Sequence, residues 1–188
     1  MAVHFPREHP VTPARGTRKK VAGAASGAAS GAASGAAAGA NAPVLVRYGE
    51  EHDLAAIHMI EAGSFGDPWA LEGFRDMLDH PRAKVIVATE ADGAVIGYAV
   101  AWYVADEAEI ANLAVAQSAR RRGIGALLLD RILDIAATFG ARSVFLEVRE
   151  SNGPAQNLYA SRRFEVAGRR KAYYRKPVED ALVMRRVI

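Results

Sequence analysis

The stretch that decides the fold reads Ile110-Ala111-Asn112-Leu113-Ala114-Val115 and then, after four residues, Arg120-Arg121-Arg122-Gly123-Ile124-Gly125. An apolar, strand-like run is followed by a glycine-containing turn, which opens the clearest helical pattern of the chain, over residues 123–139. Gly140 lies just past the end of that pattern. Another apolar run, residues 144–148, comes next. Strand, helix and strand in this order predict a parallel crossover.

The turn before this helix has the composition of a phosphate-binding site. Gly123 and Gly125 let backbone N–H groups approach a ligand closely, and the helix dipole favours negative charge at that end. Arg120, Arg121 and Arg122 add positive charge. We expect a pyrophosphate to bind here, although Gly-x-Gly alone is a weak motif and a solvated arginine run would explain the same residues. Neither a Walker lysine nor a full dinucleotide fingerprint is present.

From residue 44 onward the chain predicts a mixed α/β fold. Apolar, β-branched runs and helical spacings alternate along it. The expected strands are residues 44–48, 84–89, 95–104, 110–115, 144–148, 164–166 and 181–187, and the expected helices are residues 53–62, 69–79, 123–139 and 154–161. This order indicates one three-layer domain over residues 44–188, in which helices cover a mixed sheet of the α+β kind.

Residues 1–43 differ in composition and are expected to form a disordered tail. Residues 23–38 read Gly-Ala-Ala-Ser three times and then Gly-Ala-Ala-Ala, a period of four without a large side chain. Such a segment cannot bury enough apolar surface to offset the entropy of ordering. A basic cluster at residues 15–20 precedes it. We interpret the cluster as part of a solvated tail, and an arm that tethers the protein to RNA or to the ribosome is the alternative.

The distribution of charge is uneven. The formal net charge is +3, but residues 1–43 hold five basic residues and one acidic residue, so the excess belongs to the tail. Direct nucleic-acid binding by the domain is therefore not expected. Residues 44–119 carry four basic and thirteen acidic side chains, whereas residues 120–188 carry fifteen and seven. This asymmetry favours two unlike ligands, one anionic and one cationic, and a dipole without function is the alternative.

Composition also excludes several classes of protein. Cysteine is absent, which excludes disulfides, thiolate metal sites and a cysteine nucleophile. The five histidines show no metal-ligand spacing, so no metal is expected. Outside the Ala/Gly tract, no uncharged apolar run reaches the length of a membrane span. We expect a cytoplasmic protein that does not contact a membrane.

Two side chains stand out as candidates for proton transfer. Glu147 lies between Leu146 and Val148 in an apolar strand, where a carboxylate is poorly explained by packing, although the exposed face of an outer strand would also accommodate it. Tyr159 lies on the predicted helix over residues 154–161. A phenol with a pKa near 10 can donate a proton at neutral pH, but a single helical tyrosine is more often a packing residue.

Taken together, the motifs resemble the Gcn5-related N-acetyltransferase (GNAT) superfamily. Its coenzyme motif is Gln/Arg-x-x-Gly-x-Gly/Ala after a strand. The similarity extends over about residues 44–188 and is greatest to the bacterial ribosomal-protein-alanine N-acetyltransferases. The residues that carry it are Phe65, Pro68-Trp69, Asp106-Glu107-Ala108, Leu146 to Arg149, Ser151-Asn152, Leu158-Tyr159, Arg163-Phe164, Tyr173-Tyr174, Glu179-Asp180-Ala181 and Met184.

The resemblance implies a role for each matched position. Glu147 is implied as the general base, acting through water, and Tyr159 as the general acid. Acetyl-CoA is implied as the co-substrate, bound by Leu113, Ala114, Val115, Arg120, Arg121, Arg122, Gly123, Ile124, Gly125 and Asn152. Walls or charges of a peptide groove are implied for Phe65, Trp69, Glu107, Tyr173 and Tyr174, each of which packing or solvation would also explain. Asn152 is also expected to cap the helix that follows it.

An α-amine is the expected acceptor. Its reference pKa of about 7.7–8.0 makes deprotonation at neutral pH cost about 1–1.4 kcal/mol, against about 4.6 kcal/mol for a lysine. The resemblance implies acetylation of a protein N-terminus, above all the N-terminal alanine of the eighteenth small-subunit ribosomal protein. Acetylation of a small amine such as a polyamine or an antibiotic is one alternative. A regulatory module that binds coenzyme A without catalysis is the other, and it would predict loss of the base or the acid.

Overall fold

The structure is a computed structural model that describes residues 2–4 and 43–188. In this part of the chain, one sheet has the strand order β2-β3-β4-β5-β6-β8-β7, and β1 pairs with β5 beside that path. The strands are β1 (Ala2–His4), β2 (Leu45–Tyr48), β3 (Ala83–Thr89), β4 (Val95–Val104), β5 (Glu107–Val115), β6 (Ser143–Arg149), β7 (Glu165–Arg175) and β8 (Val178–Val187). The helices are α1 (Leu54–Ala62), α2 (Leu71–Asp79), α3 (Ile124–Thr138) and α4 (Gly153–Ser161), and short 3-10 turns cover Glu51–Asp53 and Gln117–Ala119.

The predicted crossover is confirmed. Strands β5 and β6 are parallel, with Glu107 opposite Ser143 and Ile110 opposite Leu146, and α3 connects them. The other strand pairs of the described region are antiparallel. Helix α3 begins at Gly123, which is the N-cap and has a φ of 80°. Glycine tolerates this left-handed conformation without steric cost, which lets the chain turn sharply from β5 into the helix.

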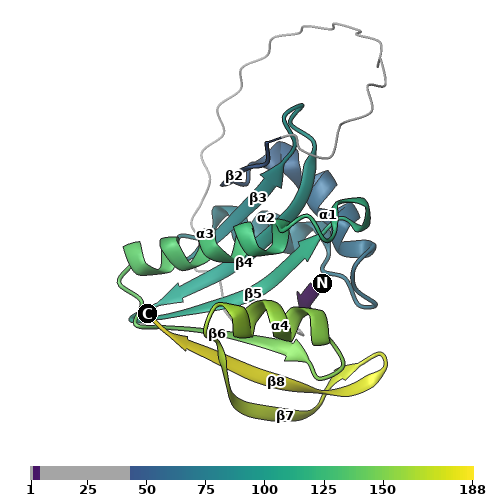
Figure 1. The fold of residues 1–188 in the computed structure, drawn as a ribbon. Helices are drawn as coiled ribbons and strands as arrows, with labels where there is room; N and C mark the ends of the chain where they lie inside the picture. The colour runs from purple at the N-terminus through teal and green to yellow at the C-terminus, as the bar shows by residue number, and fades with distance from the viewer. Residues whose placement is uncertain (1, 5–42) are drawn as a thin grey trace, which may run out of the picture. The chain divides into compact units, whose positions relative to one another are not determined.

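Helices cover both faces of the sheet, as the three-layer prediction requires (Figure 1). Alternate residues of a strand point to opposite faces. On β3, Ile86 packs in the larger core cluster with Leu128 and Ile132 of α3. The residues on either side of Ile86 in β3 instead belong to the smaller cluster, in which Ile57 of α1 and Phe74 of α2 are buried. The α3 side also contains residues of α4, so α1 and α2 form one outer layer and α3 and α4 form the other.

A β-bulge opens the middle of the sheet. Val100 of β4 lies opposite Asn112, whereas the next residue, Ala101, lies opposite Ile110, so Ala111 is an extra residue of β5. Bulges bend a strand and increase its twist. The ladder between β5 and β6 ends at Ile110 and Leu146, directly before this bulge. Beyond it the two strands diverge (Figure 1), and this gap is the feature on which the site is built.

Several predicted boundaries were too short or fell elsewhere. The strand expected at residues 164–166 is β7, which runs to Arg175, and the strand expected at residues 181–187 begins at Val178. In the described sheet, strand β7 has a neighbour only on its β8 side. Its charged side chains therefore face solvent, and they obscure the alternation of apolar and polar residues that predicts a strand. The expected tail over residues 1–43 contains β1, while the repeat and the basic cluster lie outside the described residues. No helix in the described part is both long and apolar enough to cross a membrane.

Candidate active site

Glu147 lies on β6 at the mouth of the gap. It is the residue after Leu146, the last β6 residue that pairs with β5, and it lies opposite Val183 of β8. Leu146 and Val148 point into the α3-side core, so Glu147 points to the other face of the sheet. Only 2% of Glu147 is exposed. Packing alone does not require a carboxyl group to be buried at the point where two strands separate.

Charged and phenolic groups surround the carboxyl group of Glu147. The guanidinium of Arg170, on β7, lies 2.7 Å from its Oε1 atom. The hydroxyl of Tyr173 donates a hydrogen bond to the same carboxyl group, and burial together with that bond raises the pKa of Tyr173. A cavity of about 220 Å³ adjoins Glu147 and Arg170 and is also lined by Glu107 and Glu109 of β5. Three carboxyl groups therefore face a single cavity.

Tyr159 lies on the opposite face of the sheet from Glu147. It lies on α4 within the α3-side core, where it is fully buried and packs edge-on against Phe164 at 5.8 Å between ring centroids. Its hydroxyl has no hydrogen-bond partner among the described residues. Burial, with a smaller contribution from Tyr174, raises the pKa of Tyr159 above its usual value. Tyr174 also interacts electrostatically with Glu147, so it connects the surroundings of the two candidate residues.

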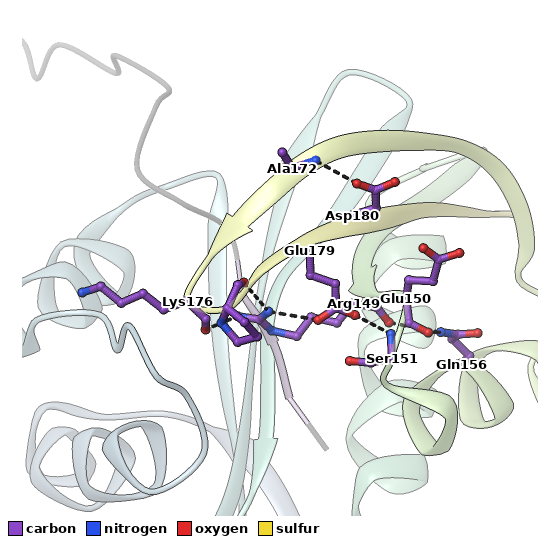
Figure 2. Close-up of polar contacts among 9 residues, drawn as sticks. Arg149, Glu150, Ser151, Gln156, Ala172, Lys176, Glu179 and Asp180 are labelled. Atoms are coloured by element: carbon purple, nitrogen blue, oxygen red, sulfur yellow. Dashed lines mark hydrogen bonds and ion pairs between the residues drawn. The ribbon is translucent and has the colours of Figure 1, made fainter.

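Polar contacts fix the segment between β6 and α4, which carries Tyr159 (Figure 2). Asn152 is the N-cap of α4, as expected, and its side-chain oxygen accepts a hydrogen bond of 3.2 Å from the Ala155 amide. Glu179, from the start of β8, accepts hydrogen bonds from the Ser151 amide and from Arg149. The Arg149 guanidinium lies 3.9 Å from the centroid of the Tyr174 ring. The β7–β8 hairpin thus holds the first part of the short loop before α4.

The N-terminus of α3 has the properties expected of an anion site. No side chain caps it, and both Arg121 and Gly123 have a left-handed backbone, with φ of 66° and 80°. A Cβ added at Gly123 would meet nothing within 4 Å, so the turn is open on that side. Ile124 is 1% exposed and its side chain packs in the α3-side core, so that side chain is not available to a ligand. Free amides at a helix N-terminus are the groups that bind phosphates.

Two of the three arginines contact other parts of the protein. Arg120 donates to the carbonyl oxygen of Val115 at 3.2 Å and contacts the Ser64 hydroxyl. Arg122 forms an ion pair of 2.6 Å with Glu90, which holds the pKa of that carboxyl group below its usual value although burial opposes the shift. The contribution of these two side chains to phosphate binding stays a prediction.

The side chains at the end of β5, before α3, all lie in the core. Leu113 and Val115 pack in the α3-side cluster and Ala114 packs in the other cluster, so their side chains are not available to a ligand. The turn at Gly123 follows this strand end after the 3-10 turn Gln117–Ala119. The contribution of these three residues to coenzyme binding stays a prediction.

The expected groove residues occupy two neighbouring segments. Phe65 and Trp69 lie between α1 and α2, and Trp69 packs on Phe74 with 5.3 Å between ring centroids. A Cβ at Gly66 would lie 3.6 Å from the carbonyl oxygen of Lys176, so this segment adjoins the β7–β8 turn. Tyr173 and Tyr174 belong to the same hairpin, on β7. None of these four aromatic residues lines the cavity at Glu147, which is bordered by strand residues and includes Glu107.

Sequence reasoning assigned no role to three residues that shape this region: Glu61, Arg170 and Glu179, of which only Glu179 was named, as part of the resemblance. Glu61 of α1 is fully buried and accepts hydrogen bonds from the Trp69 amide at 2.8 Å, from Asn112 at 3.1 Å and from the hydroxyl of Tyr98. An acid among apolar residues of a helix was the available signal. Arg170 and Glu179 belong to charged runs in which no single residue stands out.

The arrangement defines a class of protein before any comparison is made. A bulged strand that diverges from its neighbour and an uncapped helix N-terminus are features expected of a site for an elongated, phosphate-bearing coenzyme, and the acidic cavity at Glu147 would favour a cationic second substrate. Among the residues that the structure describes, no cluster of potential metal ligands occurs. Such a molecule is a coenzyme-dependent transferase.

The chain belongs to the acetyltransferase (GNAT) family, whose model matches residues 54–164. A Bacillus subtilis protein provisionally named ribosomal protein bS18-alanine N-acetyltransferase is 38% identical over 140 residues, which cover 74% of this chain and 92% of that protein. The N-alpha-acetyltransferase RimI of Mycobacterium tuberculosis is 36% identical, with 64% and 76% covered. The crystal structure of the Escherichia coli ribosomal-protein-S18-alanine N-acetyltransferase superposes with a TM-score of 0.72 at 32% identity, covering 78% and 94%. The protein is therefore an acetyltransferase that uses acetyl-CoA.

Proposed function

We propose that this acetyltransferase modifies a protein N-terminal amine, and that the alanine at the N-terminus of ribosomal protein bS18 is its main acceptor. The observation that carries the proposal is the cavity next to Glu147, where Glu107 and Glu109 add two further acidic side chains. A cationic N-terminus is favoured in such surroundings, because opposite charges steer association. The names of the similar proteins supply the acceptor, bS18 alanine.

Residues of this chain would hold acetyl-CoA along β5 and α3. Backbone groups of Leu113 and Val115 face the gap, and the amides at Gly123–Gly125 would bind the pyrophosphate. Acetyl-CoA would supply, as a thioester, the acetyl group that is transferred. The unpartnered hydroxyl of Tyr159 fits such an occupant, because a buried hydroxyl gains a partner when a polar atom enters the gap.

Glu147 would act as the general base. It takes a proton from the amine through a water molecule while the amine nitrogen bonds to the acetyl carbon and the carbon–sulfur bond breaks. Tyr159 would protonate the departing thiolate. Because burial keeps the pKa of this phenol above its usual value, the proton is present at the start of each turnover. Arg170 and Tyr173 orient the carboxyl group of Glu147 through the contacts described above.

An α-amine suits this machinery better than a lysine does. One carboxyl group and one water molecule have to deprotonate the amine. At neutral pH this deprotonation costs about 1–1.4 kcal/mol for an α-amine and about 4.6 kcal/mol for a lysine. In the described structure, the groups around Glu147 are two further acids, an arginine and a tyrosine. The two acids favour the protonated form of either amine, so the difference in cost between an α-amine and a lysine remains.

A peptide panel tests the acceptor class. Peptides that begin with Ala, Ser, Met or Gly, a peptide with a blocked N-terminus and an internal lysine, and spermidine are each offered with acetyl-CoA. We expect turnover on the free N-termini, fastest on the bS18 sequence beginning with Ala, and at least about 100-fold lower kcat/KM on the lysine control. Turnover restricted to spermidine would overturn the assignment to protein N-termini.

A further inference from the structure

The gap between β5 and β6 already contains a backbone in this structure. Strand β1 runs antiparallel to β5, with Ala2 opposite Ala114, Val3 opposite Leu113 and His4 opposite Asn112. It also lies beside β6. In Figure 1, the short purple strand lies where β5 and β6 diverge. The chain therefore fills, with a segment of its own, the opening that the bulge creates.

The pairing uses the one part of the β5 edge that β6 does not cover. On its other side, β5 is paired with β4 from Val104 to Gly97. Toward β6, its ladder ends at Ile110. Backbone N–H and C=O groups beyond that point need partners, because buried polar groups of the main chain are costly when unpaired. Residues 2–4 occupy this edge through main-chain pairing, which requires no particular side chains.

The same backbone is the part of β5 that the coenzyme requires. The pantetheine arm of acetyl-CoA contains two amide groups, which can pair with a strand edge as a peptide does. In the proposed function, the main chain at Leu113 and Val115 binds this arm. Strand β1 is paired directly with Leu113 and with its neighbour Ala114. One edge cannot pair with both occupants at the same time.

We propose that residues 2–4 dock on the Asn112–Ala114 edge of β5 as an intramolecular occupant of the gap, and that acetyl-CoA must displace them to bind. The proposal rests on the proposed function only in placing the coenzyme arm along this edge. The occupant of the gap is a segment of the same chain, which residues 5–42 join to Pro43. Tethering keeps such a segment at a high effective concentration near its site, so weak pairing is sufficient.

The expected size of the effect follows from occupancy. When only a fraction of the molecules has an open gap, the apparent Kd of the coenzyme rises by the reciprocal of that fraction. A three-residue strand forms few hydrogen bonds, each of modest net strength. Occupancy of about 90% would raise the Kd of acetyl-CoA about tenfold, and this is the change that we expect removal of the segment to reverse.

The test is calorimetric titration of acetyl-CoA into four forms of the full chain. One form lacks residues 2–6, and its control lacks residues 27–31 of the repeat instead. Another carries Val3→Pro and His4→Pro, which remove two adjacent backbone donors and so interrupt pairing whichever of them faces β5. Its control carries Val21→Pro and Ala22→Pro. Thermal melting checks that all four forms are folded.

We expect the form that lacks residues 2–6 and the form with Val3→Pro and His4→Pro each to bind acetyl-CoA about tenfold more tightly than its control. Hydrogen exchange at residues 112–114 gives a second readout that does not involve the coenzyme, because loss of β1 should speed exchange there. A Kd within twofold of the control, with unchanged exchange, would overturn the proposal.

Failure of the proposed function would look different. Binding of acetyl-CoA and hydrogen exchange need no acceptor, so a chain that acetylates none of the peptides can still show displacement. Conversely, normal turnover on the alanine peptide together with equal coenzyme affinity in all forms would refute only the docking of residues 2–4. Faster exchange with an unchanged Kd would show that β1 pairs with β5 but does not compete with the coenzyme, which also overturns the proposal.

Discussion

Two regions of this molecule are each built around a buried glutamate and a buried tyrosine, and they differ in how their polar groups are used. At the α1 end, the carboxyl group of Glu61 accepts hydrogen bonds from Tyr98, Asn112 and the Trp69 amide. At the β6 end, Glu147 faces a cavity and contacts Arg170, a side chain that is itself half-exposed. The hydroxyl of Tyr98 is bonded, whereas that of Tyr159 has no partner in the described region.

The difference separates structural from chemical use of the same residue types. Around Glu61, each donor named above comes from a different part of the chain, so the network joins α1, the loop after it, β4 and β5. By contrast, the carboxyl group of Glu147 adjoins a cavity, and the buried hydroxyl of Tyr159 has no partner among the described residues. Burial alone therefore does not distinguish a structural group from a candidate catalytic group. We expect the catalytic groups to be those that adjoin a cavity or have a buried hydroxyl without a partner.

The largest expected effect is on Glu147. Glu147→Gln should lower kcat about 100-fold or more, because it removes the group that accepts the amine proton, while the Kd of acetyl-CoA stays unchanged. Steady-state kinetics with the bS18 peptide and calorimetry measure the two quantities. The matched control is Glu61→Gln, which should keep most of the activity. Equal losses of kcat in the two variants would erase the distinction between the regions.

A similar loss is expected for Tyr159→Phe, about 100-fold in kcat with little change in melting temperature. Removing a buried hydroxyl that has no partner leaves no donor or acceptor unpaired, so stability is preserved. Because burial raises the pKa of Tyr159, the wild-type rate should not fall between about pH 7 and about pH 9 through loss of this proton. Tyr98→Phe is the matched control, and it should lose stability instead of rate. Near-normal kcat in Tyr159→Phe would refute its role as the acid.

Glu61→Gln should act on stability. A glutamine places an NH2 group where the carboxyl group accepts hydrogen bonds, so at least one buried donor loses its acceptor, at a cost of about 1–3 kcal/mol. For a domain of this size the melting temperature should fall by roughly 3–10 °C. Differential scanning calorimetry measures the change. An unchanged melting temperature with a large loss of kcat would make Glu61 a participant in the reaction.

The smallest effect is expected at the rim of the cavity. Glu107 is exposed, so Glu107→Gln should raise the KM for a basic N-terminal peptide only about twofold, because exposed charges interact weakly. Salt should abolish the difference, since about 0.1 M salt screens charges beyond about 10 Å. The KM is measured at low and at high salt. An increase that persists at high salt would indicate a direct contact with the acceptor.

Features that depend on local sequence were predicted well. The helix expected at residues 123–139 is α3, Ile124–Thr138, because its apolar spacing and its glycines lie within one segment. The cap at Asn152 and the parallel crossover were likewise readable from neighbouring residues. Glu147 was identified because a carboxylate within an apolar strand contradicts its surroundings. Its catalytic role, like that of Tyr159, stays a prediction.

Features that depend on distant residues were not predictable. Glu61 is bonded to Tyr98 and Asn112, which are 37 and 51 positions away, so nothing beside it in the sequence reveals its partners. Strand β7 was recognised only at its start, because an edge strand with one neighbour needs few apolar residues. The pairing of β1 with β5 joins segments more than a hundred residues apart. Each of these features is set by tertiary contacts and not by local propensity.

The extra residue in β5 also changes the phase of the strand. Before Ala111, the even-numbered residues Ala108 and Ile110 face α3, and after it the odd-numbered Leu113 and Val115 do so. If β5 alternated regularly through Ala111 instead of forming a bulge, Asn112 would point into the apolar α3 layer and Leu113 would point toward the carboxyl group of Glu61. The bulge thus absorbs the extra residue, and at the point where β5 and β6 diverge it determines which side chains of β5 face each side of the sheet.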